Sequence, residues 1–204
     1  MQRNDLSRRS FLRGSAVTTA GATMVNATTA LLAQAEPAGS DNAAAVGPDA
    51  ASFTLQVNGV ARSIHVEPRA TLAEALRGPL GLTGTKIACN RGACSACTVL
   101  LDGLPVCSCM MLVVDVGARH VTTIEGLAKG DTLHPLQQAF IDHDALQCGY
   151  CTPGILLSCA ALLERSPQPN ADDVRAAISG HYCRCGTYPH VVAATLAAVK
   201  ASRG

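Results

Sequence analysis

The sequence contains no tryptophan, and only 3% of its residues are aromatic. A core built mainly from alanine, valine and leucine is thin, so a bound metal would help to hold the fold together. Basic and acidic residues nearly cancel, with a formal net charge of +1, which leaves no electrostatic basis for binding nucleic acid. The chain also lacks a glycine-rich nucleotide fingerprint, a phosphate loop and a serine elbow. We therefore expect no catalytic residue here.

Residues 1–35 are predicted to be an export signal. The stretch Ser7-Arg8-Arg9-Ser10-Phe11-Leu12-Arg13 resembles the twin-arginine motif S-R-R-x-F-L-K. The uncharged run that follows is rich in alanine, threonine and glycine, which is too weakly apolar for a stable membrane span. The twin-arginine route carries folded cargo, so the sequence predicts a periplasmic protein that binds its metal before export. A basic N-terminal tail without a signal function is the alternative.

Two folded domains are predicted after a linker, residues 36–50, which is rich in alanine, glycine and proline. The first domain, residues 51–126, contains short alternating apolar runs separated by Asn-Gly and Asp-Gly turns, as in β-hairpins. A threonine followed three residues later by glutamate predicts the start of a short helix. The expected elements are strands at 53–57, 60–66, 98–101, 104–106 and 121–123 and a helix at 71–78. A small sheet with one helix across it is an α+β domain.

In the second domain, residues 127–204, the apolar spacing changes to the period of a helix. Residues 155–163 are apolar on nearly all sides, which predicts a buried helix with Thr152 as its N-cap. Asn170 is a good N-cap for the next helix, and a last helix is expected at about 189–200. This domain is predicted to be entirely helical.

Four cysteines of the first domain have the spacing of a plant-type ferredoxin. Three lie in one loop as C-x4-C-x2-C, and the fourth follows beyond the second hairpin. Gly92 allows this loop to bend tightly around an inorganic core. Structural zinc sites usually take two close cysteine pairs, and the long return to the fourth cysteine does not match them. The predicted ligands of this 2Fe-2S cluster are Cys89, Cys94, Cys97 and Cys109.

The second domain contributes another set, C-x2-C followed by C-x-C. Both pairs lie at expected helix ends, where backbone amides can hydrogen-bond sulfur and raise the cluster potential. The spacing alone leaves a four-cysteine zinc site open as an alternative. The predicted ligands of the second 2Fe-2S cluster are Cys148, Cys151, Cys183 and Cys185.

Two cysteines remain outside these sets. Cys107 lies two residues before Cys109 and is either a rival ligand or a buried small apolar residue. Cys159 lies inside the predicted buried helix and is interpreted as a core residue. The six histidines, including His181, are interpreted as surface or packing residues. His181 and Tyr182 directly precede the last cysteine pair and are candidates for tuning the second cluster.

The two sets in this order resemble those of the iron–sulfur subunit of the molybdenum hydroxylases, the xanthine dehydrogenase and aldehyde oxidoreductase family. The resemblance covers roughly residues 51–200. Ala88 and Ser95 stand where the family usually has glycine, but no ligand is missing. Gly-Thr-Tyr after the last cysteine is similar to the isoquinoline 1-oxidoreductase-like and periplasmic aldehyde dehydrogenase-like branch. The segments that carry the resemblance are 82–89, 94–103, 108–109, 147–154 and 183–188.

The resemblance implies a β-grasp ferredoxin domain followed by a four-helix bundle, each with one 2Fe-2S cluster. It also implies a large partner subunit that binds molybdopterin and oxidises an aldehyde or an N-heterocycle. Cys185 matches the family's ligand nearest the pterin, and Gln147 matches a residue on the cofactor side. By analogy, electrons enter at the bundle cluster and leave from the ferredoxin cluster to an FAD subunit or a cytochrome c.

Two other classes of protein compete with this interpretation. One is a zinc-stabilised exported binding or assembly protein without redox activity. The other is a disulfide-rich secreted scaffold, although such scaffolds rarely gather C-x-C and C-x2-C in metal-like loops. Colour separates them from an iron–sulfur protein, because 2Fe-2S proteins are red-brown and the other two are colourless.

Overall fold

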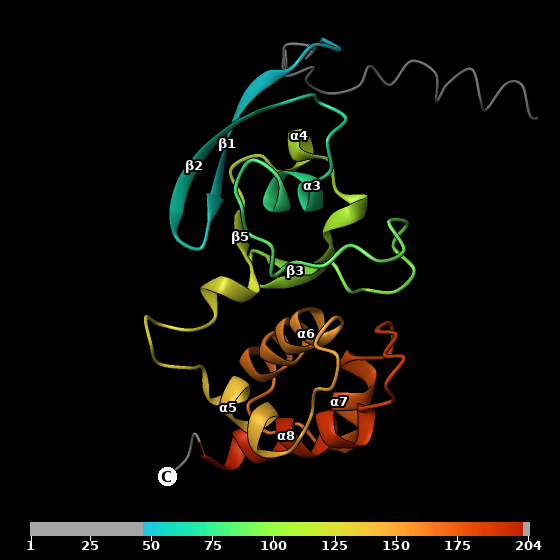
Figure 1. The fold of residues 1–204 in the computed structure, drawn as a ribbon. Helices are drawn as coiled ribbons and strands as arrows, with labels where there is room; N and C mark the ends of the chain where they lie inside the picture. Colours follow the sequence, from blue (N-terminus) through green and yellow to red (C-terminus); the bar gives the residue numbers. More distant parts are fainter. Residues whose placement is uncertain (1–46, 202–204) are drawn as a thin grey trace, which may run out of the picture. The chain divides into compact units, whose positions relative to one another are not determined.

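The computed structural model describes residues 47–201. The predicted signal and residues 36–46 of the predicted linker lie outside the described residues. All described residues belong to one compact unit of the chain. Within it, a five-stranded sheet with two short helices precedes four further helices, as Figure 1 shows. This confirms the predicted α+β class. No helix within residues 47–201 is long and apolar enough to cross a bilayer.

The sheet is mixed, with strand order β2-β1-β5-β3-β4. Both predicted hairpins form, and β5 joins them by pairing parallel to β1 and antiparallel to β3. At the first turn Asn58 and Gly59 both have positive φ, 52° and 78°, which is the conformation that a two-residue hairpin turn requires. The strands are β1 (Ala51–Val57), β2 (Val60–Val66), β3 (Thr98–Leu101), β4 (Leu104–Cys107) and β5 (His120–Thr122).

Helix α3 (Leu72–Arg77) packs on the sheet and begins at the predicted capping box. The Glu74 N–H donates to Thr71 Oγ1 at 3.2 Å, and the Glu74 carboxylate accepts from the Thr71 N–H at 2.8 Å. Its leucines join an aliphatic core formed by the strands. A second helix, α4 (Val113–Val116), was not predicted, because a single turn has no detectable apolar period.

The four remaining helices share a second core, separate from that of the sheet. Helix α6 is buried nearly all round, as predicted, because Leu157 and Ala161 contact Leu100 of β3 while its other faces line the helical core. The expected cap of α6 is wrong by one residue: Cys151 is the N-cap and Thr152 begins the helix. The helices are α5 (Pro135–Asp142), α6 (Thr152–Arg165), α7 (Ala171–Ala177) and α8 (Tyr188–Ala201).

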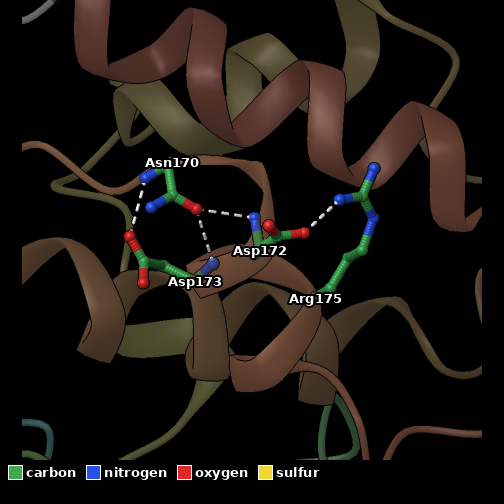
Figure 2. Close-up of polar contacts among 4 residues, drawn as sticks. All are labelled: Asn170, Asp172, Asp173 and Arg175. Carbon is green, nitrogen blue, oxygen red and sulfur yellow. Dashed lines mark hydrogen bonds and ion pairs between the residues drawn. The ribbon is translucent and has the colours of Figure 1, made fainter.

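Helix α7 is only two turns long and is held at its start by side chains, which Figure 2 shows. Asn170 Oδ1 accepts from the N–H groups of Asp172 and Asp173, and the Asp173 carboxylate accepts from the Asn170 N–H at 2.8 Å. Arg175 forms an ion pair with Asp172 at 2.6 Å. The predicted cap at Asn170 is therefore confirmed, and it fixes where α7 begins.

Candidate metal centres

The first cysteine set is gathered by a loop that changes direction several times. Asn90, Gly92 and Ser95 all have left-handed backbone conformations, with φ of 49°, 70° and 55°. A Cβ at Gly92 would also lie 2.9 Å from Met110 Cγ, so the exposed Met110 side chain would have to move. Three of the sulfurs come from this loop between α3 and β3, and the fourth comes from the 3₁₀ helix η2 (Ser108–Met110). The set is Cys89, Cys94, Cys97 and Cys109.

Within this set the thiols contact one another in two pairs. The Cys89 thiol interacts with that of Cys94, and the Cys109 thiol with that of Cys97. A binuclear cluster needs this arrangement, because its four thiolates are shared between two irons. The pairing of Cys89 with Cys94 and of Cys97 with Cys109 is therefore compatible with a cluster in which each iron takes two thiolates.

Backbone amides of the loop donate to two of these sulfurs. The Gly92 N–H is 3.3 Å from Cys109 Sγ, and the Ala93 N–H is 3.3 Å from Cys89 Sγ. Backbone hydrogen bonding from Arg91, and next the contact with the Cys94 thiol, lower the pKa of Cys89 to about 7. Burial raises the pKa of Cys109 to about 11. A metal bound at Cys109 would therefore have to displace a proton from a buried thiol.

The second cysteine set joins two turns of the helical part. Cys148 and Cys151 come just before α6, and Cys183 and Cys185 come just before α8. These thiols also interact in pairs, Cys151 with Cys183 and Cys148 with Cys185. Each pair takes one cysteine from each turn. A cluster held here would therefore tie the start of α6 to the start of α8.

The second set has one buried side and one exposed side. Cys151 is buried, and burial raises the pKa of its thiol to about 12. At Cys183 burial opposes ionisation, but hydrogen bonds from Thr187, the Cys151 thiol and the Gly186 backbone together outweigh it and lower the pKa of this thiol to about 7. The Thr187 Oγ1 atom lies 3.3 Å from Cys183 Sγ. Cys148 and its neighbour Gln147 are exposed, so this side of the set faces solvent.

A backbone hydrogen bond links the two sets. The Tyr182 N–H donates to the Cys94 carbonyl oxygen at 3.2 Å, and Tyr182 directly precedes Cys183. The cysteine loop and α6 also lie close together at a second point. A Cβ at Gly154, in the first turn of α6, would lie 2.5 Å from the Ser95 carbonyl oxygen. The spacing of the cysteines gave no indication of this link, since the two partners are far apart in the sequence.

The two cysteines outside these sets behave differently from the eight within them. Cys107 Sγ is 3.8 Å from Ser95 Oγ and 3.9 Å from the Gly92 carbonyl oxygen, so its thiol bonds to the loop. Cys159 is fully buried in the helical core, as predicted, and burial raises the pKa of its thiol to about 11. The ten cysteines all lie within residues 47–201 and form no disulfide there.

Sequence reasoning missed a polar contact beside the second set. His181 is only 5% exposed, and its Nε2 lies 2.8 Å from Ser158 Oγ on α6. Burial lowers the pKa of His181 to about 4, so the imidazole is neutral at physiological pH. By contrast, Tyr182 is 69% exposed. Of the two, His181 is thus a packing residue and Tyr182 a surface residue. The serine has no sequence signal that could have identified it.

Comparison with known families gives two matches. Residues 123–196, which include the second cysteine set, match the 2Fe-2S binding domain family. Residues 5–25 match the twin-arginine translocation pathway signal sequence. The second match lies outside the described residues, and it confirms the predicted twin-arginine export signal.

Individual relatives match most of the chain. The aldehyde oxidoreductase iron–sulfur-binding subunit PaoA of Escherichia coli O157:H7 is 41% identical over 93% of this chain and 86% of its own length. The nicotinate dehydrogenase small FeS subunit of Eubacterium barkeri is 42% identical over 73% of this chain and 95% of its own. The structure of quinoline 2-oxidoreductase from Pseudomonas putida 86 aligns with a TM-score of 0.73 and 43% identity, covering 76% of this chain and 97% of that chain. The chain therefore belongs to the 2Fe-2S small subunits of the molybdenum hydroxylases, oxidoreductase subunits that carry two 2Fe-2S clusters in complexes whose partner holds the molybdenum cofactor.

Proposed function

We propose that this chain carries electrons from the molybdopterin of a large partner subunit to an external acceptor during oxidation of an aldehyde or an N-heterocycle. When bound, a 2Fe-2S cluster supplies one-electron chemistry, and the protein supplies its position and surroundings. We assign the ligands to the two cysteine sets described above. These are Cys89, Cys94, Cys97 and Cys109 for one cluster and Cys148, Cys151, Cys183 and Cys185 for the other.

The observation that carries this proposal is the hydrogen bond from the Tyr182 N–H to the Cys94 carbonyl oxygen, at 3.2 Å. It completes a short route of covalent bonds and one hydrogen bond between two proposed ligands, Cys183 and Cys94. Electron tunnelling decays more slowly along bonds than across empty space. The bond therefore supports a relay, in which electrons pass from one set to the other. It argues against two carriers that work independently.

The exposed side of the second set is the proposed docking side for the molybdopterin subunit. Cys148 and Gln147 are exposed and Cys185 is half-buried, so a partner can cover them directly. We assign Gln147 and Cys185 to contact with the cofactor. Electrons then leave from the first set, either to an FAD subunit or to a cytochrome c. The names of the relatives, which include aldehyde and nicotinate enzymes, support both proposed substrate classes.

The proposed location is the periplasm. The match of residues 5–25 to the twin-arginine signal supports it. We also propose that the chain is organised as signal 1–35, linker 36–50 and domains 51–126 and 127–204. The separate cores of the sheet and of the helices support this division into two domains.

The test of the function is metal analysis of the purified complex. We expect two irons and two acid-labile sulfides for each proposed cluster, and two distinct EPR signals after reduction. Both signals should appear when substrate is added to the complex, because the substrate's electrons pass through this chain. Zinc in place of iron, a single EPR signal, or clusters that substrate cannot reduce would contradict the proposal.

The test of the location is replacement of both signal arginines, Arg8→Lys with Arg9→Lys. We expect the protein to remain in the cytoplasm and to keep its iron there, because cluster insertion precedes export. Fractionation followed by iron analysis measures both. Normal export of this double variant would contradict the twin-arginine assignment.

A further inference from the structure

The backbone segment of residues 181–183, which carries the Tyr182 N–H, is held from one side by a single side-chain hydroxyl, that of Tyr188. This hydroxyl accepts a hydrogen bond from the Cys183 N–H at 2.7 Å and donates one to the His181 carbonyl oxygen at 2.9 Å. One oxygen atom thus satisfies the backbone groups on both flanks of Tyr182. Tyr188 is itself well fixed, because it is the first residue of α8 and packs against the helical core.

The other side of the segment is held by His181. Its ring bonds to Ser158 on α6, and its backbone N–H donates to the Ile178 carbonyl oxygen at 2.9 Å. With both neighbours of Tyr182 fixed in this way, the direction of the Tyr182 N–H is also fixed. That N–H is the donor of the hydrogen bond to Cys94.

We propose that the Tyr188 hydroxyl is a positioning residue for electron transfer between the two clusters. It acts through the backbone by aligning the Tyr182 N–H with the Cys94 carbonyl oxygen. The inference rests on the proposed function, because it assigns a role to the route between the two cysteine sets. It goes beyond that function by naming a side chain, outside both ligand sets, on which the rate depends.

The bond between Tyr182 and Cys94 is sensitive to small movements. Its length of 3.2 Å is at the long end of the range for an N–H···O hydrogen bond, so a modest shift of the segment breaks it. Removing the Tyr188 hydroxyl leaves two backbone groups without their partner, and one of them belongs to the buried His181. Such groups move to find new partners, because an unsatisfied buried polar group is costly.

The chain offers a control hydroxyl on the same helix. Thr195 of α8 is fully buried, and its Oγ1 donates to the Val191 carbonyl oxygen at 2.8 Å. Tyr188→Phe and Thr195→Val each remove one hydroxyl and keep the shape of the side chain. They differ in whether the lost hydroxyl holds the backbone around Tyr182.

The experiment uses the intact complex and three measurements. EPR gives the intensity of both cluster signals, and hydrogen exchange of the peptide 179–188 reports the Tyr182 amide. Rapid-freeze EPR gives the rate at which an electron from substrate moves from the second cluster to the first. For Tyr188→Phe we expect both signals at full intensity, exchange about tenfold faster, and slower transfer. For Thr195→Val we expect wild-type values in all three.

Unchanged exchange and transfer in Tyr188→Phe, or equal effects in both variants, would overturn the proposal. Failure of the proposed function looks different, because it shows already in the wild type as a missing EPR signal. If Tyr188→Phe loses the second signal, the test moves to Tyr188→4-aminophenylalanine, whose amine donates and accepts at the same position. That variant should restore wild-type exchange and transfer. Slow transfer in it, with both signals present, overturns the proposal.

Discussion

The two cysteine sets have the same number of sulfurs in the same paired arrangement, but the protein builds them differently. The first takes three sulfurs from one loop, and backbone amides of that loop donate to two of the four sulfurs. The second takes its sulfurs from two separated turns, and Cys183 is hydrogen-bonded by the side chain and backbone of Thr187 and by the backbone of Gly186. The first set is thus mainly a local structure. The second exists only where α6 and α8 are packed together.

Burial also differs between the sets. In the first, Cys97 and Cys109 are 2% and 5% exposed and form a small cluster with Ala73 of α3. In the second, only Cys151 is buried and Cys148 is exposed. The first set therefore supports the core of the sheet, whereas the second lies at a surface of the helical part. Damage to one set should leave the other intact, and the following predictions test this independence.

The largest expected effect comes from removing a thiol of one set. Cys148→Ala should abolish the EPR signal of the second cluster and about halve the iron content, because each cluster holds half of the iron. The first signal should remain. Cys107→Ala is the control, since its thiol bonds to the loop and to none of the proposed ligands, and it should keep both signals. Loss of both signals in Cys148→Ala would show that the sets are not independent.

The contact between the sheet and helix α6 should be the next most sensitive feature. Leu157 is 1% exposed and packs with Leu100 of β3. Leu157→Ala should lower the free energy of unfolding by about 2–5 kcal/mol, because it removes buried apolar atoms and leaves a cavity. Urea denaturation measures this. Leu104→Ala, at a site 55% exposed, should change it by less than about 0.5 kcal/mol. Equal losses in both variants would mean that this contact does not stabilise the fold.

Two buried serines, one beside each set, should give a smaller effect on stability when either is removed. Ser108 Oγ donates to the Cys97 carbonyl oxygen at 2.6 Å, and Ser158 Oγ bonds to the His181 ring. Each change to alanine should cost about 1–3 kcal/mol, since a buried partner loses its hydrogen bond. Ser108→Ala should alter the EPR line shape of the first cluster alone, and Ser158→Ala that of the second alone. A line shape that changes in the opposite cluster would argue against the assignment of the sets.

The smallest expected effect is a pH dependence confined to the helical part. His134 Nδ1 accepts from the Leu136 N–H at 3.2 Å as the N-cap of α5, and burial lowers the pKa of His134. As the pH falls through the ordinary histidine range, the unfolded chain binds a proton before the folded chain does, so stability falls. His134→Asn keeps a capping oxygen without titrating and should lose this part of the dependence. Urea midpoints between about pH 8 and pH 5 compare the two. Parallel curves for both proteins would contradict the role of His134.

Local patterns allowed much of this structure to be predicted. The Asn58-Gly59 turn and the caps at Thr71 and Asn170 were all predicted correctly, because each depends on residues within a few positions of one another. Helix α4 was missed because one turn carries no period. The cap of α6 was misplaced because Cys151 and Thr152 are both compatible with the motif's position, and no side-chain hydrogen bond caps that helix.

The link between the two sets could not be predicted in the same way. Cys94 bonds to Tyr182, and Ser158 bonds to His181, across long separations in the sequence. Such contacts depend on how α6 packs against β3, and no local pattern records that packing. The cysteine spacing identifies the kind of cluster. The residues that fix the position of one cysteine set relative to the other can be identified only from the three-dimensional structure.

Gly154 has a consequence for exchanging parts between related subunits. Its missing side chain allows the first turn of α6 to lie against the cysteine loop of the sheet, where a Cβ would be 2.5 Å from the Ser95 carbonyl oxygen. A chimera that joined this sheet part to a helical part with any larger residue at position 154 would force the two redox loops apart. Both parts could then fold and bind iron while electron transfer between them became slow. Glycine at this one position thus limits which helical parts can be recombined with this sheet.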